Sequence, residues 1–359
     1  MPPHSRTKGA LKLPGKVRIG IIGTGKIGRY KHLPAYVKHP DAEILALCDV
    51  SKEALDEVAA ELGVKHKFAD YNDLLKMDEI DAVDICTPNY LHAGPTIAAL
   101  NSGKHVLVEK PIAINAEEGA AMVEAARKSG KKLMVAMCCR WRSDAQALKR
   151  FVAAGDMGEI YYARVHALRR RGIPGWGVFT QKDKQGGGPL IDIGVHALDL
   201  TLWLMGHPKP TAASGLCYTK FGTRPGLVGL FGAWDHTNYT VEDFATGLVR
   251  FENGASLTIE ASFAANIEKD IFNTALLGVE GGCELSPLKM FREEKQTLLD
   301  VTPVFLPQVN IHEAEIFDFI EAVRDDKPVP VPGEEALSVT KILDAIYKSS
   351  EEGREVPIA

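Results

Sequence analysis

The strongest constraint on the fold is a glycine-rich turn that directly follows a short apolar run. Residues 17–28 read Val-Arg-Ile-Gly-Ile-Ile-Gly-Thr-Gly-Lys-Ile-Gly, which places Gly23, Gly25 and Gly28 in a G-x-G-x-x-G motif. The first glycine allows a tight turn, the second lets a pyrophosphate approach the backbone, and the third lets the next helix pack against the strand. The helix N-terminus then faces the phosphates. The predicted dinucleotide-binding residues here are Gly23, Thr24, Gly25, Lys26 and Ile27.

An acidic residue stands where a dinucleotide fold holds the adenosine ribose. The apolar run of residues 42–48 ends at Asp49, and such a run predicts a second strand. A carboxylate at that strand's end accepts a hydrogen bond from the ribose 2'-hydroxyl and repels a 2'-phosphate. Asp49 therefore favours NAD, while the nearby Lys52 leaves NADP open as an alternative.

Bulk composition excludes several classes of partner. A chain of 359 residues, 45% apolar and 25% charged, is typical of a globular protein of two domains. The net charge of -5 gives no attraction to nucleic acid or to an anionic membrane. No apolar run approaches the roughly 20 residues that cross a bilayer. The six cysteines lack a C-x-x-C pair and zinc-site spacing, so we expect reduced thiols in a cytoplasmic protein.

The pattern of apolar runs changes near residue 140. Before it, strand-like runs alternate with helical patterns, which predicts a doubly wound parallel sheet, a Rossmann domain over residues 16–140. The expected strands are residues 17–22, 42–48, 82–86, 105–108 and 133–138, and the expected helices lie near residues 27–39, 52–62, 94–102 and 116–129. Beyond it, longer strand candidates predict an antiparallel or mixed sheet in an α/β domain of residues 141–359, with strands at residues 160–168, 212–221, 241–251, 255–263 and 271–277. Asn253-Gly254 between two of these strands predicts a two-residue turn with both residues at positive φ. Residues 1–15 are basic but lack the apolar core of a signal peptide, and we expect a disordered leader.

One predicted helix, residues 190–203, is apolar nearly all round. Its exceptions are Asp192, His196 and Asp199, whose spacing puts them on one face. Buried ionisable groups are costly unless they are paired or line a wet cavity, so this face is a candidate site. The alternatives are a structural histidine with capping acids, or a zinc pair for which the sequence offers no third ligand.

Two further clusters end predicted strands at the rim where a Rossmann sheet holds its ligand. Glu109-Lys110-Pro111 follows one apolar run, and Thr87-Pro88-Asn89 with His92 follows another. Lys110 read alone is equally a solvated lysine at a strand end, and the second segment is equally a turn before a helix.

Through these motifs together, the chain resembles the Gfo/Idh/MocA oxidoreductase family, and the resemblance covers residues 17 to about 350. The resemblance implies a Rossmann domain followed by an α/β domain whose open, mostly antiparallel sheet forms a homodimer or homotetramer interface. It implies NAD-dependent oxidation of a secondary hydroxyl of a sugar, sugar derivative or cyclitol such as inositol. It also makes Lys110, Asp192 and His196 the expected catalytic residues. The expected cofactor contacts at the rim are Asp49, Thr87, Pro88, Asn89, His92, Glu109 and Lys110.

Hydride transfer assigns a role to each catalytic residue. As the hydride leaves, the hydroxyl proton must leave too, and a neutral histidine such as His196 is a suitable base. The Lys110 ammonium would stabilise the developing negative charge, and Asp192 would contact substrate or orient His196. Trp176, which offers a stacking surface, and Arg140 are further substrate-binding candidates, with an exposed basic loop as the alternative for Trp176. No metal is expected.

Two other functions share these features. Some proteins of similar sequence use bound NAD for transient oxidation during glycoside hydrolysis, and others bind the dinucleotide as regulators without chemistry. The intact set of Lys110, Asp192 and His196 argues against a regulator. Met137-Cys138-Cys139-Arg140 stands where many similar proteins carry a polar residue, so contacts expected from that segment are in doubt.

Overall fold

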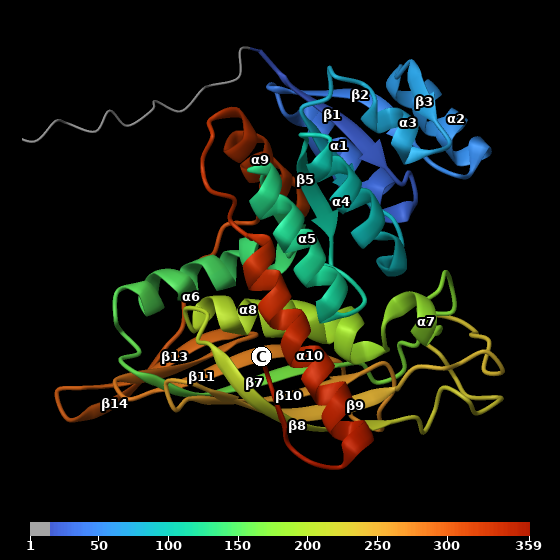
Figure 1. The fold of residues 1–359 in the computed structure, drawn as a ribbon. Coiled ribbons are helices and arrows are strands. Elements are labelled where there is room, and N and C mark those ends of the chain that lie inside the picture. The colour runs from blue at the N-terminus through green and yellow to red at the C-terminus, as the bar shows by residue number, and fades with distance from the viewer. Residues whose placement is uncertain (1–14) are drawn as a thin grey trace, which may run out of the picture.

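The computed structural model describes residues 15–359. The disordered leader expected at residues 1–15 lies outside the described residues apart from Gly15. Two sheets dominate the molecule, and in Figure 1 helices α5, α6, α8 and α10 lie between them. Among the helices of the described residues, none is both long enough and apolar enough to cross a membrane.

The first sheet has six parallel strands in the order β3-β2-β1-β4-β5-β6. This order reverses direction between β1 and β4, which is where a doubly wound sheet opens a ligand crevice at the carboxyl ends of its strands. The predicted Rossmann fold is confirmed. Its strands are β1 (Val17–Ile22), β2 (Ala42–Cys48), β3 (His66–Phe68), β4 (Ala82–Ile85), β5 (His105–Glu109) and β6 (Leu133–Ala136). Its helical elements are η1 (Gly28–His32), α1 (Leu33–Lys38), α2 (Lys52–Leu62), α3 (Tyr71–Leu75), η2 (Asn89–Leu91), α4 (Ala93–Asn101) and α5 (Ala116–Ser129).

Local signals set the ends of two of these helices. At the start of α2 the Ser51 side chain accepts from the backbone N–H of Ala54, and Gly63 ends the helix at a φ of 68°. In α5, Asn115 plays the same part at the start and Gly130 at the end, with a φ of 66°. Side-chain acceptors at N-caps and glycines in the left-handed region are favoured there because they satisfy the free backbone groups without strain. Both helices therefore begin and end where the sequence predicts.

The second sheet has nine strands in the order β14-β13-β12-β11-β7-β10-β9-β8-β15. Strands β7 and β10 pair in parallel, and the other recorded neighbours pair antiparallel. The expected open, mostly antiparallel sheet is confirmed. Its strands are β7 (Ile160–Leu168), β8 (Pro210–Tyr218), β9 (Phe244–Phe251), β10 (Ser256–Ser262), β11 (Ile271–Gly278), β12 (Gly281–Leu285), β13 (Leu288–Glu294), β14 (Thr297–Val301) and β15 (Val356–Pro357).

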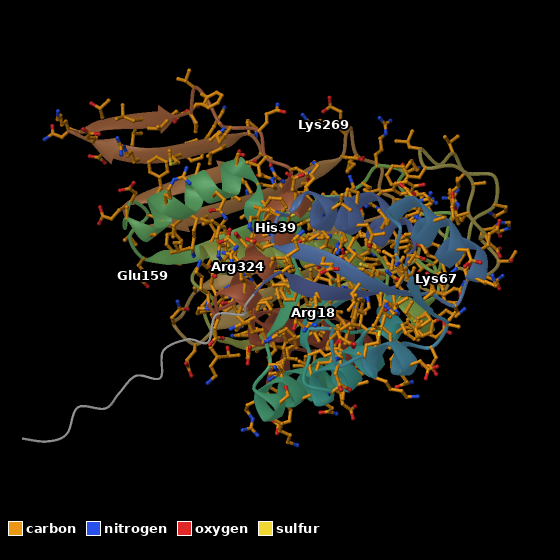
Figure 2. All side chains as sticks on the ribbon, turned by 90° about the horizontal axis from the view of Figure 1, so that it is seen from above. Arg18, His39, Lys67, Glu159, Lys269 and Arg324 are labelled. Atoms are coloured by element: carbon orange, nitrogen blue, oxygen red, sulfur yellow. The ribbon has the colours of Figure 1, made fainter. Side chains whose placement is uncertain are left out.

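Helices cover one face of this sheet and link it to the Rossmann unit (Figure 1). The long α10 contacts both β8 and α5, and α9 packs against α1. Arg324 at the end of α9 forms an ion pair with Asp41, and the Phe317 ring lies edge-on to His39 at 4.6 Å (Figure 2 labels Arg324 and His39). The chain therefore returns to its first domain near its end. The remaining helical elements are η3 (Cys138–Trp141), α6 (Ser143–Ala153), α7 (Lys182–Gln185), η4 (Leu190–Gly194), α8 (Val195–Leu204), α9 (Ile311–Arg324) and α10 (Gly333–Glu352).

The hairpin between β9 and β10 differs from its predicted form. The Phe251 N–H donates to the Ala255 carbonyl at 3.0 Å, which leaves a loop of residues 252–254. Gly254 has a φ of 85°, whereas Asn253 does not have a positive φ, and its side chain accepts from the Ala255 N–H. The prediction of two positive φ angles is wrong, because a three-residue loop needs only one left-handed residue, here a glycine.

Candidate active site

The glycine loop between β1 and η1 leaves room for a pyrophosphate. Gly23 has a φ of 100°, and a Cβ added there would lie 2.7 Å from the carbonyl oxygen of Cys86. A Cβ at Gly28 would lie 2.6 Å from the carbonyl oxygen of Gly23, whereas a Cβ at Gly25 would meet nothing within 4 Å. The turn and the helix thus need their glycines for close packing, while the space beside Gly25 is open. The residues present fit a dinucleotide phosphate.

Asp49, predicted to contact the ribose, fixes the glycine loop. Its Oδ2 accepts from the N–H and the hydroxyl of Thr24, at 2.7 and 2.9 Å, and its Oδ1 accepts from the Ser51 N–H at 2.8 Å. The Thr24 N–H is therefore directed to Asp49. A pocket beside the loop is lined by Gly25, Asp49, Thr87 and neighbouring residues, at the carboxyl ends of β1, β2 and β4.

His92 lies buried beneath the rim and contacts two of its loops. The ring is buried, with Nδ1 2.7 Å from the Pro111 carbonyl oxygen and Nε2 2.9 Å from that of Thr87. Burial lowers the pKa of His92. The sequence analysis expected this ring to contact the cofactor. In the structure it instead joins the two rim loops that contain Thr87 and Pro111. Asn89 is buried as well, and its amide donates to the Gln185 carbonyl at 3.0 Å, across to the second domain.

Glu109 belongs to a buried charged network. Its Oε1 lies 2.8 Å from His32 Nε2, its Oε2 accepts from the Lys110 N–H at 3.0 Å, and His32 Nδ1 lies 2.7 Å from Asp84 Oδ2. Burial alone would raise the pKa of Glu109, but the hydrogen bond and the charge of His32 lower it to about 2. Burial likewise opposes the charge on His32, yet Asp84 and its other neighbours raise the His32 pKa well above its usual value. Both carboxylate oxygens of Glu109 are thus occupied by protein groups.

The sequence analysis missed His32 and Asp84. The available signal was an acid inside the buried strand β4, since an ionised group at such a position requires a partner. The partner lies 52 residues away along the chain, on η1. No local pattern identifies it.

Lys110 and Asp192 come together at the junction of the two domains. Lys110 Nζ donates to the backbone carbonyl of Asp192 at 2.9 Å and to its Oδ1 at 3.0 Å. Arg169, at the end of β7, approaches Asp192 Oδ2 at 3.8 Å. Burial would raise the pKa of Asp192, but the positive charges of Lys110 and Arg169 outweigh it and lower the pKa. An ionised carboxylate therefore holds the lysine ammonium in place.

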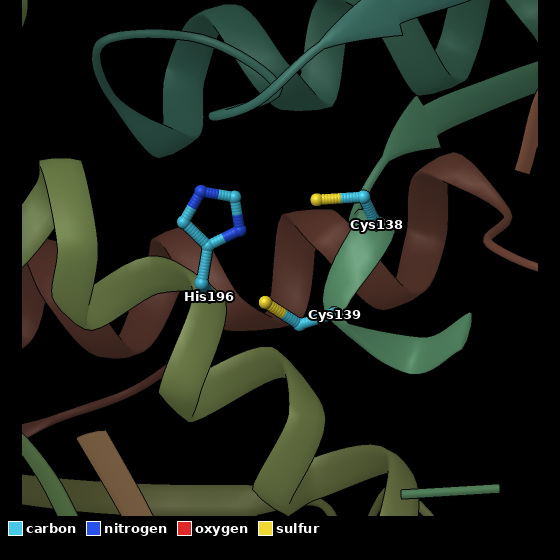
Figure 3. Close-up of side chains that lie close together, drawn as sticks. All are labelled: Cys138, Cys139 and His196. Carbon is cyan, nitrogen blue, oxygen red and sulfur yellow. The ribbon is translucent and has the colours of Figure 1, made fainter. Parts of the chain in front are cut away.

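His196 lies on α8, which continues from η4, the element that carries Asp192. The ring is half-buried, and its buried Nδ1 has no hydrogen-bond partner within the part of the chain that the structure describes. In Figure 3 this nitrogen faces the thiols of Cys138 and Cys139, while Nε2 points away from them. The contact between the two thiols lowers the pKa of Cys139, which the neighbouring His196 lowers further, and it raises the pKa of Cys138.

Arg140 does not extend into the cleft. Its Nε and Nη2 donate to the carboxylate of Asp199 at 2.9 and 2.6 Å, and its Nη1 donates to Glu335 at 2.6 Å. The side chain is 2% exposed. The whole guanidinium is thus engaged by protein groups, and Arg140 is not available to a substrate. The two acids on this helix face therefore have different partners: Asp199 binds Arg140, and Asp192 binds Lys110.

Trp176 reaches over the cofactor loop from the second domain. The ring is 44% exposed, and Lys26 Nζ lies 5.6 Å from its centroid. Phe179 and Phe231 support it, with ring centroids at 6.2 and 5.9 Å. An exposed aromatic face therefore lies beside the glycine loop.

Glu242 fixes the start of the helix that carries the candidate catalytic pair. Its carboxylate accepts from the N–H of Gly188 at 2.8 Å and of Leu190 at 3.2 Å, and from the Tyr347 hydroxyl at 2.8 Å. A Cβ at Gly188 would lie 2.1 Å from the Glu242 carbonyl oxygen, so this approach requires glycine. The sequence analysis missed Glu242, which lies 54 residues from Gly188.

The parallel sheet, its open glycine cradle and the charged residues that the second domain brings beside it define a two-domain, dinucleotide-binding oxidoreductase. Comparison with known families agrees. Residues 17–137 match the family described as "Oxidoreductase family, NAD-binding Rossmann fold", and residues 149–358 match its "C-terminal alpha/beta domain". The chain belongs to the Gfo/Idh/MocA family and carries its NAD-binding domain.

Individual relatives cover nearly the whole chain. D-glucoside 3-dehydrogenase of Escherichia coli is 35% identical over 343 residues, which are 95% of this chain and 97% of that protein. The scyllo-inositol 2-dehydrogenase (NAD(+)) of Bacillus subtilis is 29% identical over 320 residues, 87% of each chain. A structure of levoglucosan dehydrogenase in complex with NADH superimposes with a TM-score of 0.83 at 26% identity, and covers 96% of this chain and 99% of that one.

Proposed function

We propose that this protein is an NAD-dependent dehydrogenase that oxidises a secondary hydroxyl of a sugar, with C3 of a D-glucoside as the first candidate. The proposal rests on the hydrogen bonds between Lys110 and Asp192. Asp192 lies on the same helical segment as His196. The likeness to D-glucoside 3-dehydrogenase supports the substrate class, and the likenesses to inositol and levoglucosan dehydrogenases support a secondary hydroxyl on a six-membered ring.

The chemistry breaks a C–H and an O–H bond and forms a carbonyl. The glycine loop would hold NAD, which would supply the hydride acceptor. His196 takes the hydroxyl proton at Nε2, because its Nδ1 faces the two thiols. The Lys110 ammonium stabilises the negative charge that develops on the oxygen as the proton leaves.

The surrounding residues prepare these two groups. Asp192 directs the Lys110 ammonium, because its Oδ1 accepts a hydrogen bond from Nζ. Glu242 fixes the start of the helix, and so the positions of Asp192 and His196. The exposed face of Trp176 offers an apolar surface to a sugar ring beside the glycine loop.

The test is NADH formation with a panel of substrates. Methyl D-glucosides, levoglucosan and scyllo-inositol are incubated with NAD, and NADH absorbance is followed while the products are analysed by mass spectrometry. We expect NADH and a product two hydrogens lighter with at least one glucoside. Release of the methyl alcohol without net NADH would assign the protein to glycoside hydrolysis instead. Absence of both reactions across the panel would refute the proposal.

A further inference from the structure

Two adjacent cysteines and the proposed catalytic base form a group of metal-ligating side chains that the dehydrogenase reaction does not need. Cys138, Cys139 and His196 each direct one ligand atom toward the others (Figure 3). We propose that these three residues bind a thiophilic divalent cation, with Zn²⁺ as the type, and that the bound cation turns the dehydrogenase off.

The geometry is close to that of a zinc site. The two sulfurs and the imidazole nitrogen all lie within 4.8 Å of one another. A tetrahedral Zn²⁺, with Zn–S about 2.3 Å and Zn–N about 2.0–2.1 Å, holds such atoms roughly 3.5–3.8 Å apart. Small side-chain rotations therefore close the site. The cysteines lie on η3 and His196 on α8, and these two elements pack against each other, so their backbones are already in place.

The surroundings select a soft cation. All six cysteines are free thiols, and the cluster offers two sulfurs and one imidazole but no carboxylate. Thiolate and imidazole ligands favour Zn²⁺ or Cd²⁺, whereas Mg²⁺ and Ca²⁺ require oxygen ligands.

Among the described residues, the imidazole nitrogen on the cluster side lacks a partner. His196 Nδ1 is buried and forms no hydrogen bond within residues 15–359, and leaving a buried polar atom unpaired is unfavourable. A cation bound there would satisfy this nitrogen. Cys138 is 7% exposed, while Cys139 and His196 remain partly accessible, so the cation has a route of entry from the cleft.

The inhibitory effect follows from the two nitrogens of one ring, and it rests on the proposed function. A cation on Nδ1 leaves the proton of the neutral imidazole on Nε2, and that nitrogen then can only donate. His196 can no longer accept the hydroxyl proton. The sequence analysis expected no metal because it searched for spaced cysteines and for a third ligand to join Asp192 and His196. The ligands are instead a vicinal pair that the fold brings to His196 from 57 residues away or more.

The binding test does not depend on activity. The reduced, metal-free full-length protein is titrated with Cd²⁺ while the sulfur-to-cadmium absorption band is recorded, and with Zn²⁺ in competition with a chromophoric chelator. We expect one tight site per chain with thiolate absorption. Cys138→Ser, Cys139→Ser and His196→Ala should each weaken it at least about tenfold, because changes beyond the ligands themselves already cost 10–100-fold. Cys217→Ser, a partly buried cysteine on β8 outside the cluster, should bind as the unmodified chain does.

The activity test links occupancy to turnover. Stoichiometric Zn²⁺ should abolish NADH formation by the unmodified chain and by Cys217→Ser, and a chelator should restore it. Cys139→Ser, compared with its own zinc-free rate, should resist. Equal zinc affinity in the unmodified chain, Cys138→Ser and Cys139→Ser would overturn the site. A filled site that leaves turnover intact would overturn the inhibition alone, and a chain inactive with every substrate would leave the binding result standing.

Discussion

At the scale of single residues, the role proposed for His196 predicts that proton transfer can be lost without loss of cofactor binding. The side chain lies on α8, whereas the phosphate cradle lies between β1 and η1. His196→Ala should therefore lower kcat by roughly 10²–10⁴ through loss of the base, with NADH affinity nearly unchanged. Steady-state kinetics and NADH fluorescence titration measure the two effects. His66→Ala, an exposed histidine on β3, serves as the matched control. A near-normal kcat for His196→Ala on the true substrate would contradict the assignment.

Asp49 carries the prediction on cofactor choice. Asp49→Asn keeps the size of the side chain and one acceptor oxygen, but it removes the negative charge that repels a 2'-phosphate. The ratio of kcat/KM for NAD to that for NADP should fall at least about tenfold, equivalent to about 1.4 kcal/mol. Because Asp49 also holds Thr24, we expect the value for NAD itself to fall somewhat. An unmodified chain that uses both cofactors equally would contradict this prediction.

Which site residues a sequence reveals depends on how far away their partners lie. A local motif identifies Gly25 and Gly28. As predicted, the space beside Gly25 is open, whereas Gly28 packs closely against the strand side of the turn. Arg140 and His92 are equally visible in the sequence, but their partners are not. The partners of Arg140 are 59 and 195 residues away, and only the fold shows that they occupy its whole guanidinium.

At the scale of elements, the network of Asp84, His32 and Glu109 ties η1 to β4 and β5. His32→Phe fills similar space but leaves two buried acids without their cation, which should cost about 3–5 kcal/mol of unfolding free energy. Urea denaturation measures it. Arg29→Ala breaks an exposed pair with Glu57 and should cause a far smaller change. Equal stability of both variants would show that the buried network contributes nothing.

The pH dependence of that difference has a definite sign. The folded-state pKa of Glu109 is lowered from 4.5 to about 2, so its contribution is full above 4.5 and is lost as pH falls toward 2. The pKa of His32 is raised above 6.5, so its contribution is full below 6.5 and is lost as pH rises through the folded-state value. The gap in stability between the unmodified chain and His32→Phe should therefore be largest between pH 4.5 and 6.5. A gap that keeps growing above that window would contradict the assignment.

Elements were predictable where their signals are local. The bounds of β1, β2, β7, α2 and α5 match the sequence, because apolar runs, caps and glycines define them. Strands β12 to β14 were missed, since they are short, partly exposed and interrupted by glycines and charges. The strand expected over residues 133–138 is shorter in the structure, because β6 ends at Ala136 and η3 begins at Cys138, although Met137 and Cys138 extend the apolar run.

At the scale of the whole molecule, the sequence predicts two domains but not their contact. The pair of Arg324 and Asp41 joins residues 283 positions apart, and it brings α9 back onto the Rossmann unit. No periodicity in α9 distinguishes a helix that packs there from one that packs on the second sheet. Contacts between residues far apart in the sequence likewise bring the Lys110 and His196 segments together at the junction of the two domains. The candidate site therefore forms only in the folded chain.

The uncovered face of the second sheet predicts that two or more copies of the chain assemble. Helices cover one of its faces (Figure 1), while the other carries partly exposed side chains such as Leu248 on β9, paired in register with Thr258 on β10. A broad sheet face left to water is unfavourable, and a second copy of the same face would cover it with two-fold symmetry. Light scattering at micromolar concentration should therefore give at least twice the monomer mass of 39.1 kDa.

Leu248→Glu should shift this assembly toward the monomer, because two carboxylates would be buried opposite each other at the interface. Val37→Glu makes the same chemical change at an exposed position on α1, in the Rossmann unit, and should leave the mass unchanged. The comparison separates a sheet-face interface from general effects of added charge. An unmodified chain that stays monomeric, or an assembly that Leu248→Glu leaves intact, would exclude this face as the interface.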